Sequence, residues 1–134
     1  MTEVMPTARE LEALKVLWKD GKATVRAIYE TLRPGREDMA YTTVLSLLQT
    51  MEQKGLVGKD SVGKAHLYYA RVQRAHTFRQ LAGNFLDRVF DGAVDEYVVR
   101  AIESHAPSVR ELEELERMIA VAKRRARQRG RKGE

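Results

Sequence analysis

The 134-residue chain contains no cysteine. Disulfides, thiolate metal sites and cysteine nucleophiles are therefore excluded. The sequence also lacks a run of 18 apolar residues, so no membrane-spanning helix is expected. It has no basic leader followed by an apolar segment, which argues against a secretory signal. Together these absences lead us to expect a cytoplasmic protein with no membrane insertion.

Motifs that carry catalytic or metal chemistry are also absent. His66, His76 and His105 fall in different predicted elements without an HExxH pair, so neither a zinc site nor a catalytic triad is predicted. The glutamates at 113–116 lie on a predicted amphipathic helix, where such a cluster is typical of a solvated face. No glycine-rich phosphate loop follows a strand. We expect no enzymatic activity, no metal and no cofactor.

Charge is unevenly distributed along the chain. Residues 1–74 hold 12 Lys/Arg against 9 Asp/Glu, residues 75–122 hold 5 against 9, and residues 123–134 hold 7 against 1. A basic first part beside an acidic middle predicts contact with a polyanion by the former and with protein by the latter. The basic tail at 123–134 fits either a nucleic-acid arm or a solvated, frayed helix end.

The first half of the sequence predicts three helices. Thr7 and Glu10 form a capping box before an apolar stripe that includes Trp18, for which core packing is predicted, and Asp20-Gly21 ends this helix. A second helix is expected from near Thr24 to Pro34-Gly35. A third, over 41–54, follows after a short turn, which is the order of a helix-turn-helix unit.

The third predicted helix is apolar on one side and uncharged but polar on the other. Val44, Leu47, Leu48 and Met51 form the apolar stripe. Short uncharged donors and acceptors lie opposite and can enter a DNA groove at little desolvation cost. An ordinary surface helix is the alternative. The predicted DNA-reading residues are Tyr41, Thr42, Thr43, Ser46, Gln49 and Thr50.

After Gly55 the spacing of the apolar residues changes from the helical period of 3.6 residues to the strand period of 2, which predicts two strands around a loop near Ser61 to Lys64. A hairpin after a polar third helix is the wing of a winged helix. Lysines on it would contact phosphate, or would serve only as a charged edge that prevents aggregation. The predicted contacts to the DNA backbone are Arg36, Lys54, Lys59, Lys64 and His66.

Residues 75–122 predict three amphipathic helices, and Ser108 with Glu111 forms a second capping box. Three helices in about 50 residues cannot cover so much apolar surface alone, so we expect a second copy to cover it. A ligand pocket is the alternative for the phenylalanine stripe. The predicted dimer interface comprises Phe78, Leu81, Phe85, Val89, Tyr97, Leu112, Leu115 and Ile119.

The expected fold is thus mainly α with a small β wing. A winged helix-turn-helix domain at 1–74 is followed by a three-helix dimerisation domain at 75–122 and a basic tail at 123–134. Five segments of the sequence are informative together: LEALKVLW at 11–18, AYTTVLSLLQTMEQKGLV at 40–57, the hairpin from Gly63 to Tyr68, LDRVFDGAVDEYV at 86–98 and SVRELEEL at 108–115. In this order they resemble the penicillinase repressor (BlaI/MecI/CopY) family of bacterial regulators.

That resemblance implies a transcriptional repressor that binds palindromic operators as an interlocked homodimer. Family members that respond to β-lactams are cleaved at an Asn-Phe bond, where this chain has Arg100-Ala101, so the resemblance does not identify the upstream sensor, whether proteolytic or of another kind. Copper sensing through cysteines is excluded. The alternative function is a winged-helix protein-protein interaction module, since the fold serves both uses.

Overall fold

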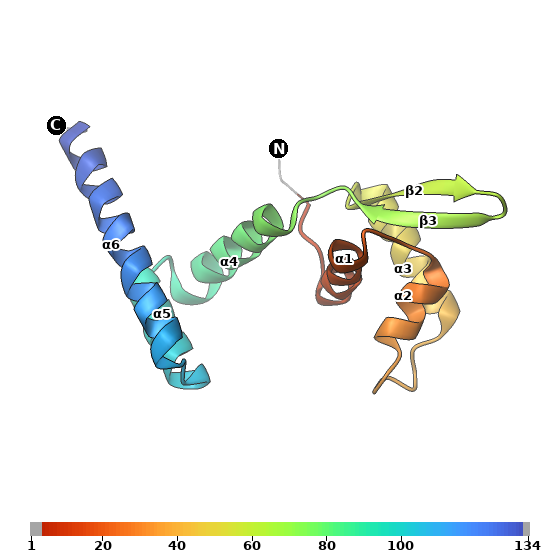
Figure 1. The fold of residues 1–134 in the computed structure, drawn as a ribbon, viewed down its shortest axis with the longest axis horizontal. Helices are drawn as coiled ribbons and strands as arrows, with labels where there is room; N and C mark the ends of the chain where they lie inside the picture. The colour runs from red at the N-terminus through yellow and green to blue at the C-terminus, as the bar shows by residue number, and fades with distance from the viewer. Residues whose placement is uncertain (1–3, 133–134) are drawn as a thin grey trace. The chain divides into compact units, whose positions relative to one another are not determined.

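The computed structural model describes residues 4–132 and consists mainly of helices with one small antiparallel sheet, which confirms the predicted fold class (Figure 1). The chain divides into two compact units, one reaching to Phe85 and the other beginning at Leu86. This division falls inside a helix that begins near the predicted boundary at residue 74. The elements are α1 (Ala8–Asp20), β1 (Lys22–Ala23), α2 (Val25–Leu32), α3 (Tyr41–Lys54), β2 (Val57–Val62), β3 (Ala65–Ala70), α4 (Arg74–Phe90), α5 (Val94–His105) and α6 (Val109–Lys132).

The core of the first unit is formed by the apolar faces of α1, α2 and α3 together with the base of the hairpin. The predicted capping box at Thr7 is present, and Gly21 ends α1 with a φ of 86°. Trp18 packs against this core, and its indole N–H donates to the Val72 carbonyl at 2.9 Å, so the predicted packing role is confirmed. The most deeply buried apolar residues are Ala13, Leu14, Leu17, Ile28, Val44, Leu48, Met51, Leu56, Val57 and Tyr68.

The sheet has the strand order β1-β3-β2, and both pairings are antiparallel. Strands β2 and β3 are joined through a turn at Gly63 and Lys64, with Val62 opposite Ala65 and a φ of 61° at Gly63. The hairpin is anchored in the core through Leu56 and Tyr68. Strand β1 was not predicted, because two residues are too few to show a period.

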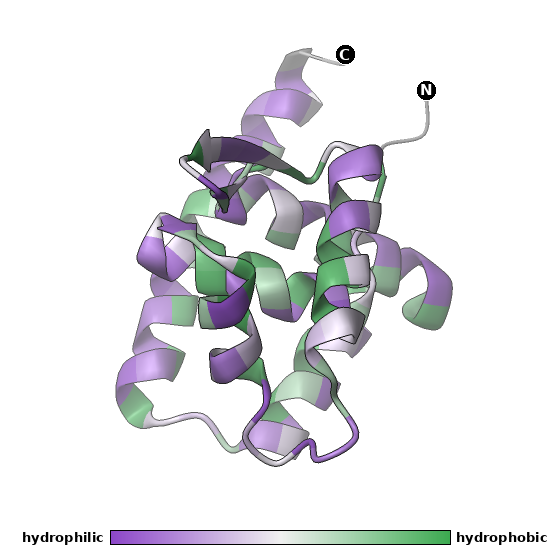
Figure 2. Cartoon of the chain, turned by 90° about the vertical axis from the view of Figure 1, so that its right-hand side faces the viewer, coloured by the Kyte–Doolittle hydropathy of each residue, from purple (hydrophilic) through white to green (hydrophobic). Residues whose placement is uncertain are grey.

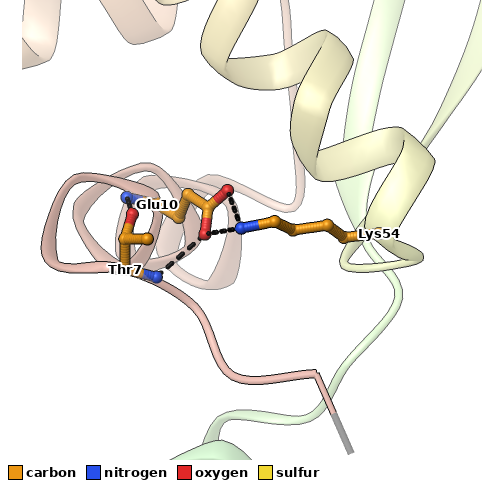
Figure 3. Close-up of polar contacts among 3 residues, drawn as sticks. All are labelled: Thr7, Glu10 and Lys54. Atoms are coloured by element: carbon orange, nitrogen blue, oxygen red, sulfur yellow. Dashed lines mark hydrogen bonds and ion pairs between the residues drawn. The ribbon is translucent and has the colours of Figure 1, made fainter.

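One ion pair joins the first turn of α1 to the last turn of α3 (Figure 3). The Glu10 carboxylate is 2% exposed, accepts from the Thr7 backbone N–H at 2.8 Å, and lies 2.9 and 3.0 Å from Lys54 Nζ. Burial disfavours the ionised carboxylate, but the Thr7 N–H and Lys54 outweigh this effect and hold the pKa of Glu10 below its ordinary value. Glu10 is therefore a buried anion that depends on Lys54 for compensation.

The second unit is built differently from the first. Neither α5 nor the described part of α6 has a buried residue, although both carry apolar stripes. The second predicted capping box is present, with reciprocal 3.1 Å hydrogen bonds between Ser108 and Glu111. The basic residues after Ala122 continue α6 as far as Lys132. Within residues 4–132 no helix is long and apolar enough to span a bilayer.

Replacing Lys54 with Met should lower the free energy of unfolding by about 2 to 3 kcal/mol, because Glu10 would remain buried without a counter-charge. Urea denaturation at neutral pH measures this loss. The Lys54→Met, Glu10→Gln double variant should lose less free energy of unfolding than Lys54→Met alone, since a glutamine amide retains the contact with Thr7 without a charge. Equal losses in the single and double variants would contradict the assigned role of the ion pair.

The contribution of Glu10 to the free energy of unfolding should depend on pH in a defined direction. Because the pKa of folded Glu10 lies below its ordinary value of 4.5, its contribution to stability is present above pH 4.5 and is lost as the pH falls through the folded pKa. Acid titration of the unfolding free energy should therefore be less steep in Glu10→Gln than in the parent protein.

Candidate nucleic-acid interface

The outward face of α3 is polar and uncharged. Thr42, Thr43, Ser46, Gln49 and Thr50 are all exposed, while Val44, Leu48 and Met51 on the opposite face are buried. Burial of the apolar stripe therefore fixes which side chains point outward. The N-cap residue Ala40 provides no side-chain hydrogen bond. A row of hydroxyls and amides is thus presented along the helix without a charged group before Glu52.

Aromatic rings join α2 to the start of α3. The edge of the Tyr29 ring meets the Tyr41 ring at a centroid distance of 5.8 Å. The Arg26 guanidinium lies 5.2 Å from the Tyr41 centroid, and Arg33 lies 5.8 Å from that of Tyr29. Sequence reasoning missed both arginines, because such contacts depend on how α2 and α3 pack. Tyr41 is 37% exposed and joins the polar face to a cationic neighbour.

Three of the five predicted backbone contacts already have a carboxylate partner within the chain. Arg36 binds Glu12 through both of its terminal nitrogens, and this hydrogen bonding holds the pKa of Glu12 below its ordinary value. Lys54 is held by Glu10. Lys59 Nζ lies 3.6 Å from a carboxylate oxygen of Glu52 on α3. These three cations are less available to phosphate than the sequence alone indicates.

The two other predicted contacts lie near the tip of the wing. Lys64 occupies the turn, is exposed, and has no carboxylate partner among residues 4–132. His66 lies opposite Ser61, with its Nδ1 3.3 Å from the Ser61 hydroxyl. Opposed and alternate residues of a hairpin share a face, so the register places His66 on the same face as Lys59. Lys64 and His66 therefore lie nearer the tip of the wing than Lys59, which is paired with Glu52.

The other face of the wing is fixed by close packing. Tyr69 lies opposite Gly58, and a Cβ at that glycine would fall 2.5 Å from the Tyr69 hydroxyl oxygen and 2.6 Å from Cζ. The Tyr69 ring therefore covers a position that only glycine permits. On the same face, Lys22 of β1 binds Asp60 of β2 at 2.5 Å. These contacts hold the two strands of the hairpin together and tie β2 to β1.

The predicted dimer residues fall in both units. Phe78 meets Trp18 edge-on at 5.8 Å, with the Arg74 guanidinium 4.4 Å from its ring centroid, so it is packed within the first unit. Leu81 is half-buried. Phe85, Val89, Leu115 and Ile119 are exposed. Tyr97 meets the Phe90 ring at 5.4 Å, and Leu112 is half-buried.

In the second unit, α5 and α6 border an apolar groove of about 500 Å³. Leu112, Leu115 and Ile119 line it from α6, facing Val98 and Ile102 from α5. This groove brings together three of the eight predicted interface residues. In the part of the chain that the structure describes, no group of three or more His, Asp or Glu side chains is arranged to hold a metal ion.

Three helices, a hairpin on their core and an exposed polar third helix define a winged helix-turn-helix protein. The penicillinase repressor family model matches residues 6–121, and the chain belongs to this family. Membership places it among DNA-binding transcriptional repressors and not among enzymes.

Individual relatives are distant but cover most of the chain. The methicillin resistance regulatory protein MecI of Mammaliicoccus sciuri is 24% identical over 113 residues, which span 84% of this chain and 91% of that protein. The penicillinase repressor of Bacillus licheniformis is 22% identical over 119 residues, spanning 89% and 92%. The solution structure of the DNA-binding domain of the repressor BlaI is 20% identical, with a TM-score of 0.48, and covers 55% of this chain and 92% of that one.

Replacing Gly58 with Ala should lower the free energy of unfolding by about 1 to 3 kcal/mol, because the new methyl group displaces the Tyr69 ring. Chemical denaturation measures the loss, and adding Tyr69→Ala should relieve part of it. The matched control is Gly83→Ala, where no atom lies within 4 Å of the added methyl group and the helix favours alanine. A loss at Gly58 no larger than that at Gly83 would contradict the packing argument.

Proposed function

We propose that the protein is a homodimeric repressor that reads palindromic operators with α3 and contacts their phosphates with the wing. The observation that carries this proposal is the exposed, uncharged polar face of α3. Threonine, serine and glutamine side chains can pair with base edges in the major groove, and glutamine fits adenine. The N-terminal half of such a helix is the part that enters the groove in helix-turn-helix proteins. Such a repressor acts where the bacterial chromosome lies, in the cytoplasm.

The ion pairs refine the proposed phosphate contacts. Lys64 and His66 at the wing tip are the first candidates. Arg26 beside Tyr41 is added to them, although its guanidinium also lies 4.0 Å from the Glu30 carboxylate. Lys59 would reach phosphate only by leaving Glu52, so its contribution is smaller. Lys54 and Arg36 act mainly within the fold, where each holds a carboxylate of α1. Phosphate contacts fix the register of the protein on the duplex, while α3 supplies the sequence preference.

The proposed dimer rests on the unburied apolar surface of the second unit. Val94, Val99, Met118 and Ile119 are each about half exposed, and Leu115 is 36% exposed. Apolar surface on this scale marks an interaction site. A second copy covers it most simply, because a two-fold dimer uses the same surface on both chains. Two-fold symmetry in turn places two copies of α3 on two operator half-sites, which explains palindromic recognition.

A protein-binding role for α3 has less support. The central part of a protein interface is apolar and rich in aromatic residues. The outward face of α3 from Thr42 to Thr50 instead carries hydroxyls and one amide. Apart from Tyr41 at its N-terminal end, this face presents hydrogen-bonding groups, which suit base edges better than a protein partner.

Replacing Gln49 with Ala should weaken binding to the preferred operator by about 1 to 3 kcal/mol and leave binding to unrelated DNA nearly unchanged. The operator is the duplex that the wild-type protein selects from a random-sequence pool. Fluorescence anisotropy at fixed salt concentration measures both affinities.

Lys64→Ala is the matched control for this experiment. It should weaken operator and unrelated duplex alike and reduce the slope of log K against log salt by about 0.9, because one phosphate contact is lost. If Gln49→Ala lost the same affinity for the operator and for the unrelated duplex, Gln49 would not be a residue that reads a base.

Replacing Ile119 with Asp should weaken dimerisation by about 3 kcal/mol or more, because each chain would bury an unpaired charge in the interface. Analytical ultracentrifugation over a concentration series gives the dissociation constant. Arg110→Asp, on the opposite side of α6, should leave dimerisation unchanged. A stable wild-type monomer at micromolar concentration would overturn the proposed dimer.

A further inference from the structure

Helix α6 extends beyond the part of the chain that the family accounts for. The family match ends at residue 121, whereas α6 continues to Lys132. Residues 123–132, named here the basic arm, carry seven lysines and arginines and no aspartate or glutamate. In Figure 2 the turns of α6 that lead to the C-terminus are coloured hydrophilic. The family therefore assigns no role to a helical segment of high positive charge.

Packing within the chain does not explain the basic arm. The apolar stripe of Leu112, Leu115 and Ile119 continues into the arm only as Ala126 and Gly130, which are too small to form a core. Each described residue of the arm is exposed. The arm thus has no apolar surface whose burial would require its helical form.

The electrostatics of a free helix do not explain the arm either. The helix dipole favours cations only within the last turn, whereas these seven span nearly three turns. Like charges four residues apart repel along a helix, and the pairs 123/127, 125/129 and 127/131 are all of this kind. The last ion pair before the arm joins Glu114 to Arg117. Among residues 123–131, the part of the arm whose side chains the structure describes, no cation has a carboxylate partner, so the repulsion is uncompensated.

We propose that the basic arm is a second DNA-binding surface, which contacts duplex phosphates without reading sequence. This inference rests on the proposed function, because DNA binding by the winged helix tethers the arm of the same chain and so raises its effective concentration at the duplex. Arginine forks match phosphate geometry, and five of the seven cations are arginines. The cations surround the helix except near Ala126 and Gly130, so only some of them contact one duplex at a time.

The composition of the arm favours DNA over a lipid surface. A helix that lies in a membrane interface buries an apolar face in the bilayer. Ala126 and Gly130 provide almost no such face. Attraction to a nucleic-acid backbone needs only positive charge and hydrogen-bond donors, and the arm presents both along its length.

The test uses the full chain with Arg125→Gln, Arg127→Gln and Arg129→Gln. The matched control is Arg79→Gln, Arg88→Gln and Arg110→Gln, which removes the same charge from exposed positions outside the arm. Affinity for the selected operator and for an unrelated duplex of equal length is measured over a range of salt concentrations. Circular dichroism and ultracentrifugation confirm that both variants keep their helices and their association state.

The arm variant should lose about 0.9 in the slope of log K against log salt for each phosphate contact removed. Both duplexes should be affected equally, so the ratio of the two affinities stays constant, and the control should retain the wild-type slope. An unchanged slope, or equal loss in the control, would overturn the proposal. A changed affinity ratio would overturn it as well, because the arm would then read sequence.

Two further results separate this inference from its alternatives. Vesicles containing phosphatidylserine attract any cationic helix, so the arm variant should bind them more weakly than wild type does. Loss of vesicle binding with unchanged DNA binding would assign the arm to lipid and overturn the proposal. If wild type preferred no duplex over another, the proposed function itself would fail. If wild type kept its preference and the arm variant kept the wild-type slope, only the role of the arm would fail.

Discussion

A single buried carboxylate, that of Glu10, joins the first turn of α1 to the last turn of α3. Glu10 caps the first turn of α1 and, with the same group, holds Lys54 in the last turn of α3. A carboxylate that is 2% exposed cannot remain ionised without such partners. The ion pair therefore ties the end of the proposed reading helix to the start of the domain. Apolar packing of Val44, Leu48 and Met51 fixes the rotation of α3, and the ion pair adds a directional contact at its end.

Other cations near the candidate nucleic-acid interface are also paired with carboxylates of the same chain. Arg36, Lys54, Lys59 and Lys22 each meet a carboxylate, so much of the positive charge of the first unit stabilises its own structure. Cations held in this way are less available for direct contact with phosphate. In the proposed repressor, discrimination between DNA sequences then depends on the polar face of α3, since charge attracts all sequences equally.

Local patterns in the sequence predicted most of the fold. The two capping boxes join residues only three positions apart, and the stripe of α3 repeats within two turns, so both are visible in a short window. The polar face followed directly, because burying Val44, Leu48 and Met51 forces Thr42, Ser46 and Gln49 outward. Long-range contacts could not be predicted in this way. Glu10 and Lys54 are 44 positions apart, and Glu12 and Arg36 are 24 apart, so their pairing depends on tertiary packing.

The absence of a buried residue in α5 and in the described part of α6 has a consequence for abundance in the cell. Helices without a core of their own gain stability from association, so in the proposed dimer the population of folded second units would increase with protein concentration. In the proposed dimer, newly made chains at low concentration would expose these helices to proteases. Degradation would then remove unpaired chains faster than paired ones, and the amount of active repressor would rise more steeply than its rate of synthesis.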